Sequence, residues 1–301
     1  MAGSRFIRAR IKSVKNTRKI TKAVELVAAS KMRRAISAAQ QSRAYARLAD
    51  EMVRAVALRK GSGFHPYLRE VDTTKPRLLL VIASDRGLAG SFNANVLKLA
   101  VTAIKKEKET DVVTVGKRAD SVRKTTTRLV ASFTGITDTP RLLEAKPLLE
   151  FVTKEFSEGK YGAVDLIYTE FKSALFQQAT VTQLLPMGGA QGAQAVQGSQ
   201  RGRMSPEEHK ETLGEGDLVI EPSPRVVIDR LLPQVLQVHL YQALLESSAS
   251  EHAARMMAMR SASDAAKDMI DDLTMSFNQM RQAGITREIA EISGGKAALE
   301  G

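Results

Sequence analysis

Residues 226–292 read VVIDRLLPQVLQVHLYQALLESSASEHAARMMAMRSASDAAKDMIDDLTMSFNQMRQAGITREIAEI. The only glycine in this stretch is Gly284, and Pro233 lies in the first turns, where a helix tolerates proline. Apolar or small side chains recur three and four positions apart, the spacing of a helix seam that faces a partner helix. The seam positions are Leu232, Val235, Val238, Tyr241, Leu245, Ala249, His252, Met256, Met259, Ala262, Ala266, Met269, Leu273, Phe277 and Met280. At 1.5 Å per residue such a helix reaches roughly 100 Å, too long to lie across one globule, so it must project and its seam must be covered.

A second long helix is predicted over residues 1–60. No proline or glycine occurs between Ser4 and Lys60, apolar residues keep helical spacing, and alanines keep the middle slim. The glycines at 61 and 63 are expected to end this helix. Because both ends of the chain form long helices that need a partner, we predict that they pair as an antiparallel coiled coil.

The middle of the chain has a different pattern. The apolar run Arg77–Ala83 after Pro76 is typical of a buried strand. Alternating strands and helices with short loops predict an α/β domain whose sheet is mainly parallel. The expected strands are 77–83, 112–115, 129–133, 163–171, 180–185 and 218–221, and the expected helices are 96–109 and 142–156.

The predicted domain organisation has three parts. Residues 1–60 form the N-terminal coiled-coil helix, residues 75–221 form the α/β domain, and residues 225–301 form the C-terminal helix that pairs with 1–60. Residues 187–216 are rich in Gly, Ala and Gln and are expected to be a flexible insert without a core of its own.

The charge of the chain is concentrated at its start. The net charge is +12, and residues 1–60 contain sixteen basic side chains against three acidic ones. A basic segment of this kind predicts an acidic counterpart, which leaves nucleic acid open as an alternative. Against nucleic acid, the segment lacks interleaved aromatic residues and its basic side chains lie around most of the helix.

Other classes of function are disfavoured by composition. The chain has no cysteine, which excludes disulfides, thiolate metal sites and thiol nucleophiles. The longest apolar run is too short to span a bilayer, and the first residues lack the apolar region of a signal peptide. The histidines lack metal-ligand spacing, and no catalytic constellation is evident, so neither a metal nor a cofactor is expected.

One loop suggests a chemical hypothesis. Residues 84–93, SDRGLAGSFN, follow the first predicted strand and precede a helix, a place where a helix N-terminus can bind phosphate. The loop matches neither G-x-G-x-x-G nor G-x-x-x-x-G-K-[ST]. We therefore favour a structural turn fixed by Asp85 and Arg86 over the alternative of an α/β nucleotide enzyme.

Three separated stretches, in the same order, resemble signatures of the gamma subunit of F-type ATP synthase, bacterial type. The resemblance covers essentially the whole chain. The first stretch holds Arg10-Ile11, Asn16-Thr17, Lys19-Ile20-Thr21-Lys22-Ala23 and Lys31-Met32; the second holds Ser84-Asp85-Arg86-Gly87-Leu88 and Phe92-Asn93; the third holds Glu251, Ala253-Ala254-Arg255-Met256, Arg281-Gln282-Ala283, Ile285-Thr286 and Glu288-Ile289.

This resemblance implies a Rossmann-like domain at the foot of the coiled coil and a function as the central-stalk rotor of a proton-translocating ATP synthase. Such a subunit is not catalytic by itself. It couples rotation of the c-ring to the conformational cycle of the beta subunits, and regulates ATPase activity and proton flow. The implied partners are the alpha and beta subunits, epsilon and the c-ring, with no nucleic acid. The implied location is peripheral, on the cytoplasmic face of the bacterial inner membrane, held there through the complex only.

The resemblance also implies contact residues, carried over position by position. Candidates for contacts with the stator are Lys19, Lys22, Arg255, Arg281, Gln282, Thr286 and Glu288. Candidates on the side of epsilon and the c-ring are Lys31, Arg33, Arg34 and Glu221. Plastid members of the family carry a regulatory dithiol, which this chain cannot form because it has no cysteine.

Overall fold

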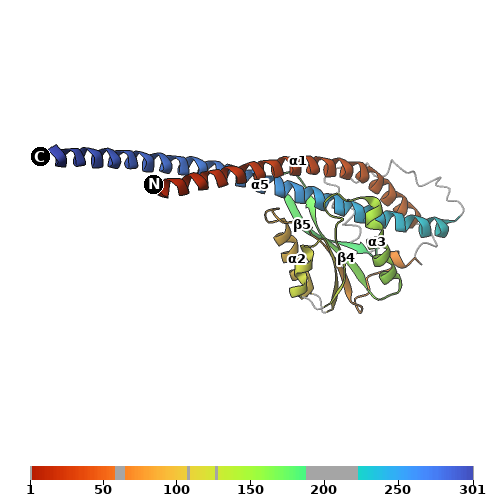
Figure 1. Cartoon of the computed structure of the whole chain (residues 1–301). Coiled ribbons are helices and arrows are strands. Elements are labelled where there is room, and N and C mark those ends of the chain that lie inside the picture. Colours follow the sequence, from red (N-terminus) through yellow and green to blue (C-terminus); the bar gives the residue numbers. More distant parts are fainter. Residues whose placement is uncertain (1, 58–64, 107–108, 126–127, 188–222, 301) are drawn as a thin grey trace. The chain divides into compact units, whose positions relative to one another are not determined.

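The computed structural model describes residues 2–57, 65–106, 109–125, 128–187 and 223–300 (Figure 1). It divides into two compact units. The helix unit comprises Met1–Ala29 and Arg255–Gly301, and the sheet unit comprises Ser30–Ala254. The predicted end of the first helix at residues 61–63, the strand 218–221 and the insert after Met187 lie outside the described residues.

Two long helices account for both ends of the chain. Helix α1 spans Ala2–Ala57 and helix α5 spans Pro224–Glu300, so the predicted stretch 226–292 is confirmed as one helix and continues beyond Ile292. Pro233 lies inside α5, near its start. Each helix contributes residues to both units.

In the helix unit, α1 and α5 run antiparallel, as predicted. The Arg8 guanidinium lies 5.7 Å from the centroid of the Phe277 ring, which joins the start of α1 to a late turn of α5. The buried positions of α5 here are Arg255, Met259, Ser263, Ala266 and Ile270, spaced three and four apart.

Part of the predicted seam is wrong by one residue. Met269 is 46% exposed, whereas its neighbour Ile270 is 8% exposed and takes the inward position. Ser263, not Ala262, is likewise the buried member of its pair. A helix with 3.6 residues per turn drifts relative to a strict seven-residue repeat, so a seam extrapolated over many turns moves off the buried face.

The sheet unit contains one five-stranded sheet with the order β3-β2-β1-β4-β5. The central strand β1 pairs in parallel with β2 and β4, and β2 pairs in parallel with β3. Only β5 runs antiparallel to its neighbour β4 among these pairs, which confirms the mainly parallel sheet. The strands are β1 Arg77–Ile82, β2 Thr110–Val115, β3 Leu129–Phe133, β4 Ala163–Phe171 and β5 Gln177–Leu185.

Helices cover both faces of this sheet. Helix α2, Phe92–Lys106, packs on one face through Val96 and Ala100, and helix α3, Leu142–Ser157, packs on the other together with α5. Side chains of β1 alternate between the two cores, with Leu80 toward α3 and Leu79 toward α2. Two short 3-10 helices, η1 Pro66–Leu68 and η2 Ala119–Lys124, were not predicted.

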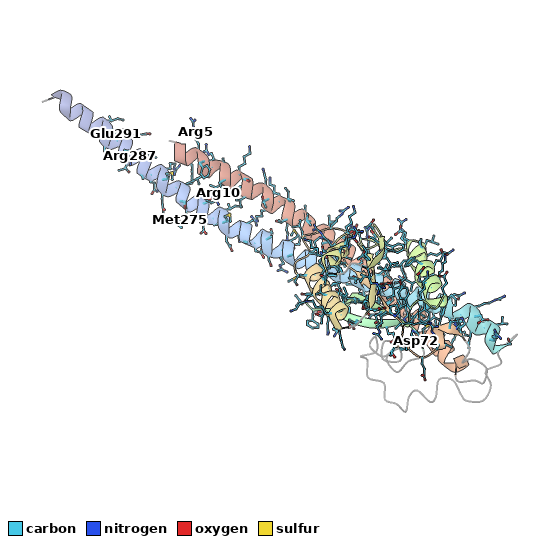
Figure 2. All side chains as sticks on the ribbon, turned by 90° about the horizontal axis from the view of Figure 1, so that it is seen from below. Arg5, Arg10, Asp72, Met275, Arg287 and Glu291 are labelled. Atoms are coloured by element: carbon cyan, nitrogen blue, oxygen red, sulfur yellow. The ribbon has the colours of Figure 1, made fainter. Side chains whose placement is uncertain are left out.

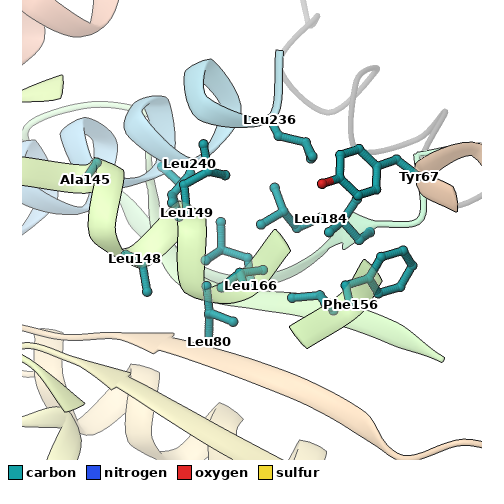
Figure 3. Close-up of a cluster of buried hydrophobic side chains, with 14 of the residues drawn as sticks. Tyr67, Leu80, Ala145, Leu148, Leu149, Phe156, Leu166, Leu184, Leu236 and Leu240 are labelled. Atoms are coloured by element: carbon teal, nitrogen blue, oxygen red, sulfur yellow. The ribbon is translucent and has the colours of Figure 1, made fainter. Parts of the chain in front are cut away.

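The first turns of α5 belong to the core of the sheet unit. Leu236 and Leu240 are fully buried and lie against α3 and the sheet, near Leu149, Leu166 and Leu184 (Figure 3). At about 25 cal/mol per Å² of apolar surface, burying a leucine side chain stabilises the fold by roughly 1.5–3 kcal/mol. The first half of α5 therefore packs into the same core as the sheet, although the predicted domains separate residues 75–221 from residues 225–301. That division stays a prediction.

Within the described residues, no helix is both long enough and apolar enough to cross a bilayer.

Candidate functional site

The turn after β1 is organised by Asp85. Its carboxylate accepts hydrogen bonds from the backbone N–H of Lys117 at 3.1 Å, the backbone N–H of Gly135 at 3.1 Å and the Thr137 hydroxyl at 2.9 Å. The carboxyl ends of β1, β2 and β3 lie at one edge of the parallel sheet, so one side chain can tie the loops that follow all three strands. The prediction that Asp85 fixes a structural turn is confirmed.

Arg86 contributes to the same turn through its backbone and not through its side chain. Its carbonyl oxygen accepts a hydrogen bond from the Ser84 hydroxyl, while the side chain is exposed. The backbone N–H of Ser84 donates to Asn93 Oδ1 at 3.0 Å, which joins the end of β1 to the first turn of α2. A carboxylate at the centre of this turn repels a phosphate, which argues against the nucleotide-enzyme alternative.

A second polar cluster lies on the loop between β3 and α3. We define the Asp138 clasp as Lys31 of α1, Asp138 of the loop, and Ser248 and His252 of α5. The Asp138 carboxylate binds the Lys31 ammonium, while its backbone carbonyl oxygen lies 2.9 Å from His252 Nε2 and accepts a hydrogen bond from the Ser248 hydroxyl at 3.2 Å. One loop residue therefore holds both long helices within the sheet unit.

The charges of the clasp favour an ionised Asp138. Burial acts to raise the pKa of the Asp138 carboxyl, but the hydrogen bond and charge of Lys31, together with His252 and Arg86, outweigh it and lower this pKa below its ordinary value. His252 Nε2 also lies 3.6 Å from Asp138 Oδ1, and the His252 side chain is 2% exposed.

Stability should respond to acid through this carboxyl. Because the pKa of Asp138 in the folded chain is lowered, its contribution is fully present above the ordinary value of about 3.9 and is lost as the pH falls through the lower folded pKa. Denaturant midpoints measured from about pH 5 down to pH 2 should therefore fall more steeply for the natural chain than for Asp138→Asn. Equal slopes would mean that Asp138 adds no stability.

The clasp also has the outline of a cation site. Asp138, Glu251 and His252 each offer a ligand atom within 4.8 Å of the others, the one such group among the described residues. The Lys31 ammonium is bound to Asp138, so a positive charge is already present beside these acids. Asp138 and His252 are 114 positions apart in sequence, which is why their spacing gave no signal.

A separate ion pair joins the helices farther along. Arg43 of α1 donates to Glu246 Oε1 of α5 at 2.9 Å, and Gln242 Nε2 donates to the same oxygen at 3.0 Å. Glu246 is 4% exposed, so the pair compensates a buried charge. Burial, followed by the charge of Glu246, raises the pKa of the neighbouring Tyr168.

The candidate stator contacts lie in the helix unit, and most are exposed. Lys19 is exposed, and Lys22 pairs with Glu25 at 3.0 Å with 57% of its side chain exposed. Residues 281–294 are all exposed, which includes Arg281, Gln282, Thr286 and Glu288. Figure 2 shows that the part of α5 carrying Arg287 and Glu291 extends past the start of α1 near Arg5.

Arg255 differs from the other stator candidates. It is 8% exposed, and it takes part in interactions within the chain. A guanidinium covered to this extent offers little surface to another subunit, so its role as a contact stays a prediction of the sequence alone.

Some candidates for the side of epsilon and the c-ring are exposed, and one is bound within the chain. Arg33 and Arg34 are exposed, whereas Lys31 is bound to Asp138 in the clasp. Glu221 lies outside the described residues. Sequence reasoning therefore found Lys31 but missed its partner Asp138, which no motif marked.

Comparison with known proteins identifies the family. The family model for ATP synthase matches residues 4–299. The ATP synthase gamma chain of Opitutus terrae is 43% identical over 301 residues, which cover 99% of both chains. This chain belongs to the ATP synthase gamma chain family. The gamma chain of Xanthomonas campestris pv. campestris is 38% identical, covering 99% of this chain and all of that one.

Solved structures agree with the fold. A chain of the central stalk and c-ring of the Tetrahymena thermophila mitochondrial ATP synthase is 26% identical, with a TM-score of 0.59, over 81% of this chain and 99% of that chain. A chain from the OSCP/F1/c-ring structure of the Euglena gracilis mitochondrial ATP synthase has a TM-score of 0.64, over 99% of this chain and 95% of that chain. At 17% identity this second likeness shows the fold alone.

Proposed function

We propose that the chain is the central-stalk rotor of a bacterial proton-translocating ATP synthase. Family membership over nearly the full length supports this assignment. The observation that carries it is the continuity of α5, because one unbroken helix, Pro224–Glu300, begins in the core of the sheet unit and runs on through the fully exposed turns of residues 281–294.

A rotor requires a shaft that is stiff and an end that does not grip its surroundings. Two helices that bury a shared seam resist twisting, and the seam of the helix unit is closed by small and apolar residues such as Ala28 and Ala266. The exposed turns 281–294 of α5 place the apolar side chains Ile285, Ile289 and Ile292, which can slide past a bearing surface, among the charged stator candidates Arg281 and Glu288. This combination supports rotation inside a ring of alpha and beta subunits.

The proposal assigns no catalytic step to the chain itself. The turn after β1 is held by the Asp85 carboxylate, which disfavours a phosphate there. The proposed partners are the alpha and beta subunits around the helix pair, and epsilon and the c-ring near the exposed Arg33 and Arg34. Association with the cytoplasmic face of the inner membrane would follow from the c-ring.

Reconstitution tests the function directly. The alpha and beta subunits are assembled with epsilon and the membrane sector, with and without this chain, and ATP hydrolysis and ATP-driven proton pumping are measured in vesicles. We expect the isolated chain to hydrolyse no ATP, and the complex to pump only when the chain is present. Equal hydrolysis and pumping with and without the chain would refute the proposal.

The exposed lysines of α1 provide a sharper test of the stator contacts. Reversing Lys19 and Lys22 to glutamate should weaken coupled turnover by about 5- to 30-fold, because each reversed charge costs roughly 0.5–1 kcal/mol against an acidic partner surface. The matched control reverses Lys105 and Lys106, which are exposed at the end of α2. If both double variants have the same effect, α1 has no electrostatic role at the stator.

A further inference from the structure

We propose that the Asp138 clasp is the joint through which load is passed between the sheet and both long helices, with Lys31 and Asp138 as positioning residues for coupling. This inference rests on the proposed rotor function, because only a subunit that carries torque needs such a joint.

The hydrogen bonds of the clasp continue into the sheet. Thr137, which is 3% exposed, donates to Asp85, and Asp85 accepts from the loops after β2 and β3. The next residue, Asp138, binds α1 through its carboxylate and α5 through its backbone carbonyl. A connected series of polar contacts therefore runs from the carboxyl edge of the sheet to both helices.

Directional contacts are suited to this purpose. Apolar packing is non-directional, so it fixes the position of a helix along its axis less sharply than hydrogen bonds do. Near the clasp, α5 buries the small residues Ser247, Ala249 and Ala253. Hydrogen bonds to charged groups depend on distance and angle, so they fix the position of the helices along their axes.

Asp138 contacts α1 through its carboxylate and α5 through its backbone carbonyl, with His252 Nε2 also 3.6 Å from Asp138 Oδ1. Lys31→Gln therefore releases α1 alone, and Asp138→Asn also removes the charge facing His252. Asp138→Asn and Lys31→Gln remove the charge pairing with α1 but retain the backbone carbonyl that Ser248 and His252 contact. Lys31→Arg keeps the positive charge and serves as the conservative rescue. Lys160→Gln is the matched control, because the pairs of Lys160 with Glu155 and Glu158 join neither long helix.

The test uses the assembled complex in vesicles. For each variant, pumped protons per ATP hydrolysed are measured together with amide hydrogen exchange of residues 134–141. Losing a charge-assisted hydrogen bond should speed exchange of this loop by about tenfold or more. We expect Lys31→Gln and Asp138→Asn to lose pumping per ATP while Lys31→Arg and Lys160→Gln keep it.

Each outcome decides the inference. If the loop exchanges faster but pumping per ATP is unchanged, the clasp does not transmit load. If exchange of the loop is unchanged, Lys31 and Asp138 do not hold the loop in place. If Asp138→Asn does not assemble, the milder Lys31→Gln decides on the same two readings. If the natural chain itself does not support pumping, the rotor function is refuted. That result differs from a loss seen only in the Lys31 and Asp138 variants, which bears on the clasp alone.

Discussion

Replacing Asp85 with alanine should lower the free energy of unfolding by roughly 3–5 kcal/mol, because hydrogen bonds to a charged group contribute about 1.5–3 kcal/mol each and partial exposure offsets part of the loss. Three donors lose their acceptor at once: the backbone N–H groups of Lys117 and Gly135, and the Thr137 hydroxyl. Denaturant unfolding of the purified chain, followed by circular dichroism, measures the change.

The control for this substitution is a carboxylate with a single surface partner. Glu150 pairs with Lys146 at 3.6 Å and its side chain is 65% exposed, so Glu150→Ala should cost less than about 0.5 kcal/mol. The cost of Asp85→Asn should lie between those of the two alanine variants. The amide oxygen can still accept hydrogen bonds, but the amide NH2 group faces N–H and O–H donors to which it cannot bond. An Asp85→Ala chain as stable as Glu150→Ala would show that Asp85 does not hold these loops together.

Where sequence pattern and burial follow the same rule, the fold was predictable. The strands β3 and β4 have the predicted bounds, 129–133 and 163–171. β4 is mostly buried, whereas β3 lies at the edge of the sheet and its side chains alternate between half-buried and exposed. Both long helices were predicted from spacing and the absence of breakers, and their antiparallel pairing followed from their need to cover each other. The one-residue error at Met269 and Ile270 arose because seam geometry depends on the drift of the helix and not on composition.

The polar joints of the sheet unit were not predictable in the same way. Asp85 was found because it lies in a loop between a strand and a helix, but its three donors come from loops that only the sheet order brings together. Asp138 follows no motif, and its partners Lys31 and His252 are more than 100 positions away in sequence. Long-range polar pairs have no local period, so one sequence alone does not reveal them.

Gly116 sets how closely the loops after β1 and β2 approach each other. Gly116→Ala should destabilise the chain by roughly 2–6 kcal/mol, because a steric overlap of about 1–3 kcal/mol adds to about 1–3 kcal/mol of strain from the positive φ. The φ of Gly116 is +91°, and a Cβ at this position would lie 2.1 Å from the carbonyl oxygen of Ala83, a backbone atom that cannot swing away. We expect little soluble, folded protein and a large shift of the unfolding midpoint.

Two other glycines separate the causes of this effect. Gly135 has a φ of +87°, and a Cβ added to it would meet no atom within 4 Å, so Gly135→Ala should show only the backbone strain, about 1–2 kcal/mol. Gly284 lies inside α5 with open space around it, so Gly284→Ala should stabilise the helix by about 0.5–1 kcal/mol. If Gly116→Ala costs no more than Gly135→Ala, the close approach at Ala83 is not required. The loops after β1 and β2 could then move apart without loss of stability. The hydrogen bond from Lys117 to Asp85 would not be fixed, and the connection from the sheet to the Asp138 clasp would not be rigid.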